Sequence, residues 1–293
     1  MGENGSPKQD SESRISLPMM TAAEPLRPVY VEWADRLERL LRLSAYPLAV
    51  KMCEKDEEIP ELARRPLRDW GYRLNACQAM SISRRYGEMI AMKAEDNWCF
   101  EPPFCFGMTG GNTGAYEEGL EFFLEGHTRY PEGAKDLETA RKWANDFPRF
   151  EDYGQYVAVV TAPLMKAAFE PDLVLLWLNP TQLNQVLQGI TCEWGRVGIT
   201  STIAAHGGCV HYIVPPMKTG DFNISNPCLG DVALAMKEPG DLVVSIPISK
   251  LQTLLRGMEQ IERNGFGMPV KYEVRPEGWL PDSYVKMREL MKM

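Results

Sequence analysis

An unbroken apolar run near the middle of the chain constrains the fold most strongly. Residues 173–178 read Leu-Val-Leu-Leu-Trp-Leu, with Asp172 before them and Asn179-Pro180 after them. A run of this length without polar alternation is typical of a strand that is buried on both faces. Such burial requires helices on both sides of the sheet. The run therefore predicts an α/β (or α+β) fold in which helices flank a mixed sheet.

Three strand-to-helix units support this architecture. The apolar run is followed by a helical pattern over residues 181–189, and a strand predicted at 241–247 is followed by a second amphipathic helix. A short strand is also predicted at 47–52. Alternation of strands and helices indicates layers of helices packed on one sheet.

The chain divides into a tail and one domain. Residues 1–25 are polar and charged, so that little burial would offset the entropy lost on ordering them, and they predict a disordered tail. Residues 26–293 are expected to form a single α/β domain. With 44% hydrophobic residues, a chain of 293 residues can fill a core of that size.

The charge of the chain limits its partners. A formal net charge of −8 disfavours nucleic acid and anionic membrane surfaces, because both require a basic face. No apolar run approaches the roughly 18 residues of a spanning helix, and no secretory signal is recognised. We expect a cytoplasmic protein whose partners are a small molecule, a second copy of the chain or a redox protein.

The stretch from Gly198 to Gly230 holds the best candidate site. A strand is predicted at 198–205, and it ends at the pair Gly207-Gly208. Thiolate and imidazole are the ligands that soft and borderline metals prefer, and glycines allow a backbone to close around a bound group. The candidate site residues of this stretch are His206, Cys209, His211 and Cys228.

Two further cysteines lie at the ends of predicted elements. Cys77 falls in the first turn of a helix predicted at 76–86, where the helix N-terminus favours thiolate. Cys99 follows a strand predicted at 88–94. The order of helix, strand and cysteine resembles the order around Cys209, so an internal pseudo-repeat is predicted. It would place Cys99 and Cys209 at equivalent strand ends that face a common cleft.

Several motifs occur in the order found in a known family. They are Pro47-Leu-Ala-Val-Lys, Ala76-Cys-Gln-Ala, Cys99 after a strand, Pro171-Asp-Leu-Val-Leu-Leu-Trp-Leu-Asn-Pro-Thr-Gln, Cys209, Pro227-Cys-Leu-Gly and Leu242-Val-Val-Ser-Ile-Pro. Over residues 38–265 they resemble the bacterial and archaeal family called domain of unknown function 169. The resemblance implies a single domain, common in anaerobes, without a settled activity. It also implies cysteines at positions like Cys77, Cys99, Cys209 and Cys228.

These four cysteines suggest an iron–sulfur cluster. A cluster needs four thiolates and tolerates wide spacing between them. We therefore expect Cys77, Cys99, Cys209 and Cys228 to approach one another and to hold a cluster. It would serve a redox or ligand-activating step on a small molecule in anaerobic metabolism, as in an oxidoreductase or a lyase.

Other interpretations of the same residues remain open. A single metal ion could use His206, Cys209 and His211, or either histidine could act as a catalytic base for the Cys209 thiol. A metal-free protein could bind a small molecule in a cleft, whose predicted lining is Trp98, Phe104, Met108 and Trp194. The sequence assigns Cys53, Cys105 and Cys192 no role beyond packing.

Overall fold

The computed structural model describes residues 27–109, 135–199, 201–268 and 282–292. The tail predicted at 1–25 lies outside the described residues. None of the described helices is both long and apolar enough to cross a membrane.

A six-stranded sheet forms the centre of the molecule, with the strand order β2-β3-β1-β4-β6-β5. All five pairings between these strands are antiparallel. Among the described residues the parallel contacts are isolated bridges, such as Arg64 with Ile90. The strands are β1 (Leu48–Cys53), β2 (Ile90–Met92), β3 (Ala158–Pro163), β4 (Leu173–Leu178), β5 (Asn223–Ser225) and β6 (Leu242–Pro247).

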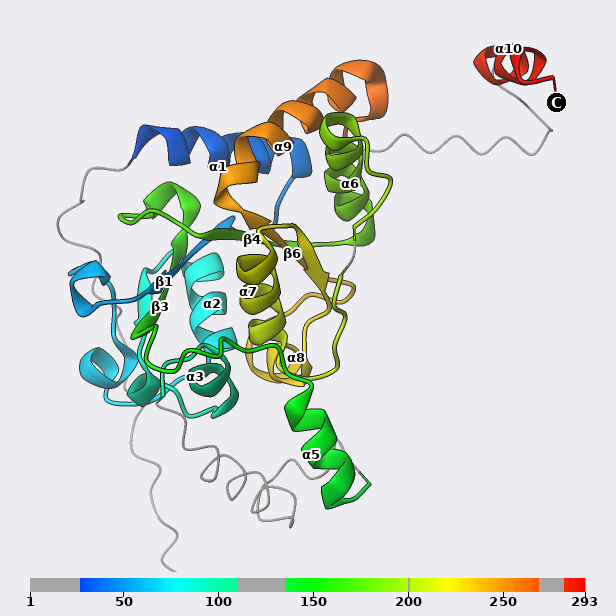
Figure 1. Ribbon diagram of the computed structural model, residues 1–293. Coiled ribbons are helices and arrows are strands. Elements are labelled where there is room, and N and C mark those ends of the chain that lie inside the picture. Colours follow the sequence, from blue (N-terminus) through cyan, green and yellow to red (C-terminus); the bar gives the residue numbers. More distant parts are fainter. Residues whose placement is uncertain (1–26, 110–134, 200, 269–281, 293) are drawn as a thin grey trace, which may run out of the picture.

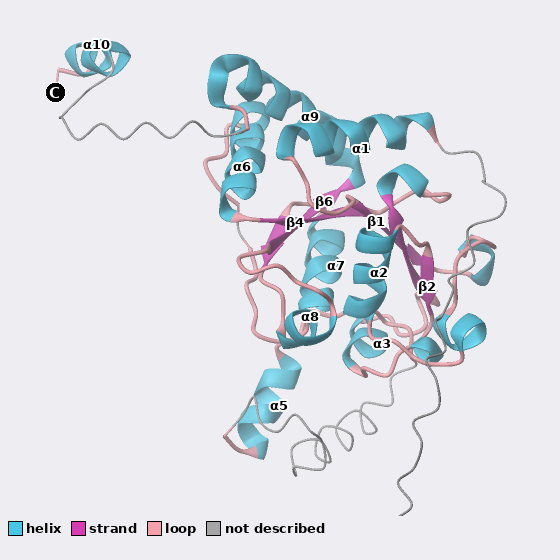
Figure 2. Ribbon diagram, turned by 180° about the vertical axis from the view of Figure 1, so that it is seen from behind, coloured by secondary structure: helices cyan, strands magenta, loops and turns pink. Residues whose placement is uncertain are grey.

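Helices cover both faces of this sheet (Figures 1 and 2). One face carries α1 (Pro28–Leu41), α6 (Pro180–Trp194) and α9 (Ile248–Ile261), and the other carries α2 (Ala76–Tyr86) and α7 (Gly208–Thr219). The prediction of an α/β fold with helices flanking a sheet is confirmed. The other α-helices in the described ranges are α3 (Glu101–Cys105), α5 (Leu137–Asn145), α8 (Leu229–Leu234) and α10 (Asp282–Leu290).

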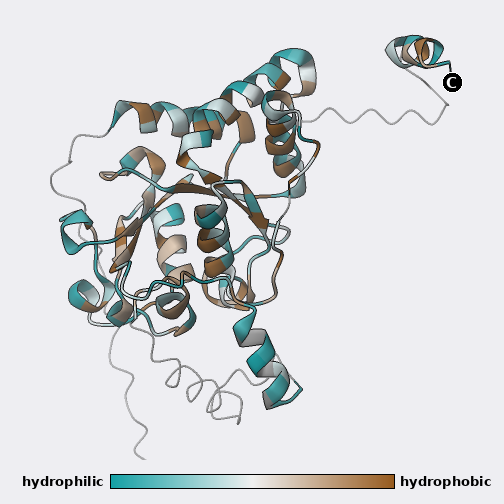
Figure 3. Ribbon diagram, viewed as in Figure 1, coloured by the Kyte–Doolittle hydropathy of each residue, from teal (hydrophilic) through white to brown (hydrophobic). Residues whose placement is uncertain are grey.

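Strand β4 shows why its sequence is apolar throughout. Val174 and Leu176 belong to the core under α1, α6 and α9, whereas Leu173 and Leu175 belong to the core under α2 and α7. Because successive side chains of a strand point to opposite faces, a strand between two helical layers needs apolar residues at every position. Figure 3 shows apolar residues in the central strands and in the helices that pack on them, and α5 as a mostly hydrophilic helix.

The described strands pair only in antiparallel fashion, whereas we predicted a mixed sheet with some parallel pairs. The chain leaves β4 through α6 on one face and continues through α7 on the other face before β5 pairs with β6. A parallel neighbour would require a crossover that returns the chain along the same face of the sheet. The route through both faces instead brings β6 back antiparallel to β4.

The strand predicted at 198–205 is not present in the described residues of that range. Ser201 and Thr202 lie beside β5, but they bond to it through side chains and not through a backbone ladder. The Ile224 N–H donates to the Ser201 hydroxyl over 2.6 Å, and the Thr202 N–H lies 3.3 Å from the Asn223 side-chain oxygen. Because this strand is missing, the order of parts around Cys99 does not recur, and the predicted pseudo-repeat is not found.

Candidate metal centre

The first of the four cysteines lies at the start of α2. Asn75 is the N-cap residue, and its side-chain oxygen accepts the Gln78 N–H over 2.6 Å. The Gln78 side chain in turn accepts the Asn75 N–H over 3.0 Å, which completes a capping box. This cap fixes where the helix begins, and it places Cys77 at the second helical position, as predicted.

The second cysteine lies at the start of α7, which the Gly207-Gly208 pair opens. Gly207 has a φ of +61°, a left-handed conformation that glycine adopts without strain. A Cβ on Gly208 would lie 2.7 Å from the Asp231 Oδ2 atom and 3.0 Å from the Cys228 backbone nitrogen. The glycine pair thus brings the helix start, and with it Cys209, close to the segment that carries Cys228. It begins a helix and does not end a strand.

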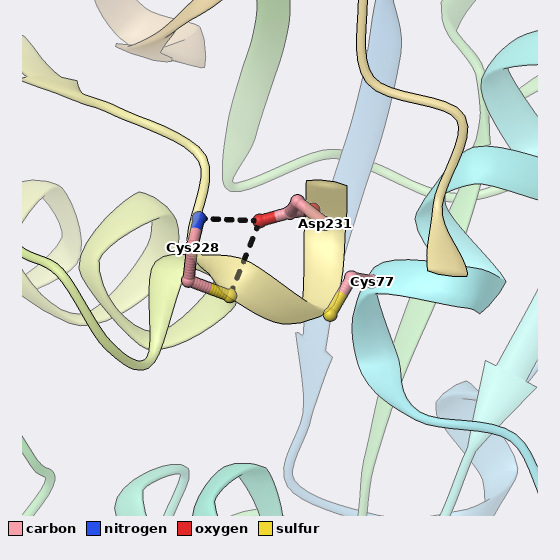
Figure 4. A group of neighbouring side chains, drawn as sticks. All are labelled: Cys77, Cys228 and Asp231. Carbon is pink, nitrogen blue, oxygen red and sulfur yellow. Dashed lines mark hydrogen bonds between the residues drawn. The ribbon is translucent and has the colours of Figure 1, made fainter. Parts of the chain in front are cut away.

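The third cysteine, Cys228, is the N-cap residue of α8. Its sulfur accepts the backbone N–H of Asp231, and the Asp231 carboxylate accepts the Cys228 N–H over 3.2 Å. The Cys228 thiol also donates to Asp231 Oδ2 over 3.5 Å, and the Tyr212 hydroxyl donates to the same oxygen over 2.7 Å. Figure 4 shows Cys228 and Cys77 beside this buried carboxylate.

The fourth cysteine, Cys99, precedes α3 and is half-buried. The backbone N–H of Glu101 hydrogen-bonds to its sulfur. Cys99 is near enough to Cys228 and Cys209 for their charges to act on it. Each of the four cysteines therefore lies in the first turn of a helix or just before it.

The Cys77 sulfur contacts two of the other three sulfur atoms. The Cys77 thiol hydrogen-bonds with the thiols of both Cys209 and Cys228. The ligand atoms of Cys77, Cys228 and Asp231 lie within 4.8 Å of one another, the only such group of three among the residues that the structure describes. Gly230 borders this group, since a Cβ there would lie 3.4 Å from the Cys77 sulfur and 3.6 Å from the Cys228 sulfur.

Burial and mutual hydrogen bonding favour the neutral form of these thiols. The hydrogen bond with Cys209 raises the pKa of Cys77 well above its usual value, and the hydrogen bond with Cys77 raises the pKa of Cys228. For Cys209 the hydrogen bond with Cys77 lowers the pKa, but burial and the nearby charges of Cys228, Cys99 and Asp231 together outweigh it, and the pKa rises to about 12. Burial also raises the pKa of Cys99 to about 12. A bound metal ion would lower the pKa of these thiols, because it stabilises the thiolate form.

The histidines do not join this group. His211 is buried on α7, and its Nδ1 atom lies 3.3 Å from the Thr202 hydroxyl. His206 lies in the loop before the helix. Among the described residues, the ligand atoms of His206, Cys209 and His211 do not form a group close enough to share one metal ion, so the predicted single-metal site is not found. The expected catalytic role of His206 and His211 stays a prediction.

The cleft predicted for a metal-free protein does not assemble from its four residues. Trp194 packs against Phe222 in the core under α1, α6 and α9, whereas Phe104 and Met108 pack in the core on the other face. Trp98 is 49% exposed, and its indole N–H donates to Gln78. These side chains therefore lie on both sides of the sheet and cannot line one cleft.

The accessibility of the thiols predicts the order in which they react. In metal-free protein at about pH 8, iodoacetamide is expected to modify Cys192 first, because it is exposed. Cys99 should follow, at a rate that rises about tenfold per pH unit below its pKa of about 12, since the thiolate is the reactive species. Peptide mass spectrometry over time measures this order. Early modification of Cys77 or Cys209 would contradict the buried centre.

The sequence analysis did not single out Asp231 or Tyr212 as parts of the site, and it interpreted Gly208 only as part of the glycine pair that ends a strand. One signal was available for Asp231, because a carboxylate three residues after an N-cap is the spacing of a capping box. Tyr212 and Gly208 carry no such signal. Their contacts with the carboxylate exist only because α7 and α8 begin side by side.

Comparison with known proteins identifies the family. The sequence profile of domain of unknown function 169, described as uncharacterised ArCR, matches residues 36–257. One relative is the uncharacterized protein MJ0308 of Methanocaldococcus jannaschii, which is 24% identical over 237 residues and covers 79% of this chain and 94% of its own length. No solved structure matches the chain. The matched range includes all four cysteines of the centre, and the chain belongs to the domain of unknown function 169 family.

Proposed function

We propose that this protein carries an iron–sulfur cluster held by Cys77, Cys99, Cys209 and Cys228. The observation that carries the proposal is the approach of three helix starts, whose cysteines Cys77, Cys209 and Cys228 are linked by hydrogen bonds through Cys77. Cys99 lies within electrostatic range of Cys228, just before a fourth helix. Chance packing of small buried side chains gives no reason for thiols to gather at helix N-termini. A site that must hold several thiolates does explain this arrangement, because helix N-termini stabilise thiolates.

The local electrostatics support thiolate ligands. A helix N-terminus carries a partial positive charge and free N–H groups, which stabilise a nearby thiolate. Backbone N–H groups hydrogen-bond to the sulfurs of Cys99 and Cys228, the kind of contact that tunes cluster potentials. Gly230 leaves free the space that a side chain would take beside Cys77 and Cys228. The donor set and its surroundings therefore fit a cluster.

A cluster in this position supplies an electron or a Lewis-acidic iron. The protein's contribution would be to exclude water from three buried thiolates, while the half-buried Cys99 lies nearer to solvent. We propose a redox or ligand-activating role on a small molecule in anaerobic metabolism, in an oxidoreductase or a lyase of the cytoplasm. A redox protein is the expected macromolecular partner.

Replacement of each cysteine by serine in anaerobically purified protein tests the proposal. Cys77→Ser, Cys99→Ser, Cys209→Ser and Cys228→Ser are each expected to lose most of the bound iron and the visible absorption. Matched controls are Cys53→Ser, buried in the core on the opposite face of the sheet, and Cys192→Ser, which is exposed. Both controls should keep iron and colour at wild-type levels.

The outcome separates the two classes of function. Circular dichroism and thermal unfolding show which variants fold, so that loss of iron can be distinguished from loss of structure. A wild-type protein that is colourless and free of iron after anaerobic purification and reconstitution would refute the cluster. The protein would then be a metal-free small-molecule-binding protein or a cysteine-dependent enzyme.

A further inference from the structure

Asp231 is a buried carboxylate without a cation in contact. It is 2% exposed, and Oδ2 accepts hydrogen bonds from Tyr212 and from the backbone and thiol of Cys228. The charge of Arg84 acts on it, but the Arg84 guanidinium donates to the carbonyl groups of Ala235 and Met236. Burial of a carboxylate costs several kcal/mol unless a cation or a full set of hydrogen bonds offsets it. Despite its three hydrogen bonds, burial raises the pKa of Asp231, and a positive charge beside the carboxylate would stabilise its charged form.

The spacing of the donor atoms suits a shared metal ion. The Cys228 sulfur lies 3.5 Å from Asp231 Oδ2. Metal–sulfur bonds of about 2.3 Å and metal–oxygen bonds of about 2.0–2.2 Å at a tetrahedral angle place two such ligand atoms roughly 3.5 Å apart. Two donor groups that bind different metals of a cluster would be farther apart. The observed spacing, which is that of a thiol–carboxylate hydrogen bond, also suits two ligands on one ion.

A purely structural role does not account for the whole arrangement. A carboxylate at the third position of α8 that accepts the N-cap N–H is an ordinary helix cap. An ordinary cap has no need of burial, nor of two thiols within 4.8 Å of it. The close approach of Gly208 also presses the start of α7 against the carboxylate, which leaves little room for it to move away.

We propose that Asp231 is a metal ligand, and that its carboxylate and the Cys228 thiolate bind the same metal ion of the centre. The inference rests on the proposed function, which assigned the metal to cysteines alone. A sulfur–oxygen donor pair suits iron or zinc and is a poor match for copper(I), which prefers sulfur. Tyr212 is then a positioning residue, because its hydroxyl holds the carboxylate in place.

Cobalt(II) binding to metal-free protein tests this assignment under anaerobic conditions, since the visible spectrum of the ion depends on its ligands. Asp231→Asn keeps the size of the side chain and removes its charge. It is expected to change the cobalt spectrum and to weaken binding by at least a hundredfold, the upper end of what the loss of an outer partner costs. Tyr212→Phe, the matched control, keeps the carboxylate and should keep the wild-type spectrum, with at most about a hundredfold weaker binding.

Each result decides between a ligand and a helix cap. If folded Asp231→Asn binds cobalt with the wild-type spectrum and affinity, Asp231 is only a cap, and the four-cysteine proposal stands without it. If the wild-type protein binds neither cobalt nor iron, the proposed function fails and this inference fails with it. Should Asp231→Asn not fold, X-ray absorption of the wild-type cobalt protein provides the answer. A shell of sulfur alone would overturn the inference, and a shell of sulfur with oxygen would support it.

Discussion

Replacement of Gly208 by alanine is expected to lower the free energy of unfolding by about 3 kcal/mol and to abolish the proposed metal binding. The added Cβ would lie 2.7 Å from both Asp231 Oδ2 and the Tyr212 hydroxyl, and 3.0 Å from the Cys228 backbone nitrogen. The two side chains are buried and bonded to each other, so neither can move aside without loss of that hydrogen bond. The start of α7 must therefore retreat from α8, and the sulfurs of Cys209 and Cys228 must separate.

Gly198→Ala is the matched control for this variant. A Cβ on Gly198 meets nothing within 4 Å, so stability and metal content should stay at wild-type levels. Urea unfolding and iron analysis measure the two effects separately. A Gly208→Ala protein with unchanged stability and full iron content would show that the helix starts do not depend on this close approach.

The second large effect is expected at the crossing of α6 and α9, on the opposite face of the sheet. Gly257→Ala should destabilise the protein by about 2–4 kcal/mol, because the added Cβ would lie 2.5 Å from the Gly189 carbonyl oxygen. In an exposed helix the same Gly-to-Ala change raises the free energy of unfolding by about 1 kcal/mol, so the effect expected here has the opposite sign. Both helices are held by backbone contact at this point, so the crossing must open.

The same variant should leave the proposed metal centre intact, because α6 and α9 do not carry any of the four cysteines. Gly257→Ala protein that still folds should therefore bind iron at the wild-type stoichiometry, in contrast to Gly208→Ala. A gain in unfolding free energy would mean that the two helices are farther apart than the structure shows. Chemical denaturation of both glycine variants in parallel provides the comparison.

Local pattern was enough to predict most elements. The apolar run of β4 predicted a strand between two helical layers because each position of such a strand faces a core. The boundaries of α2 at Ala76 and Tyr86 also agree with the sequence prediction. Asn75 caps that helix and Gly87 ends it in a left-handed conformation, and both signals are local. Elements whose signals lie within a few residues could be predicted without the structure.

The region around Cys209 shows where local pattern misled. Its residues from Gly198 onward include Ile199, Thr202 and Ile203, which favour a strand by propensity. Bonds from Ser201 and Thr202 to β5 replaced the backbone ladder, and the glycine pair opened α7 instead. Both outcomes depend on partners that are distant in the sequence. A pattern within one segment does not contain them.

The sequence by itself determined that Cys77 lies in the first turn of a helix, since the cap at Asn75 and the apolar period of α2 mark that end locally. Only the tertiary structure decided that the starts of α2, α7 and α8 meet, and that Asp231 lies between two of their thiols. It also decided that His211 turns to Thr202. The physical reason is that helix position follows from packing on the sheet, which depends on contacts between residues more than a hundred positions apart.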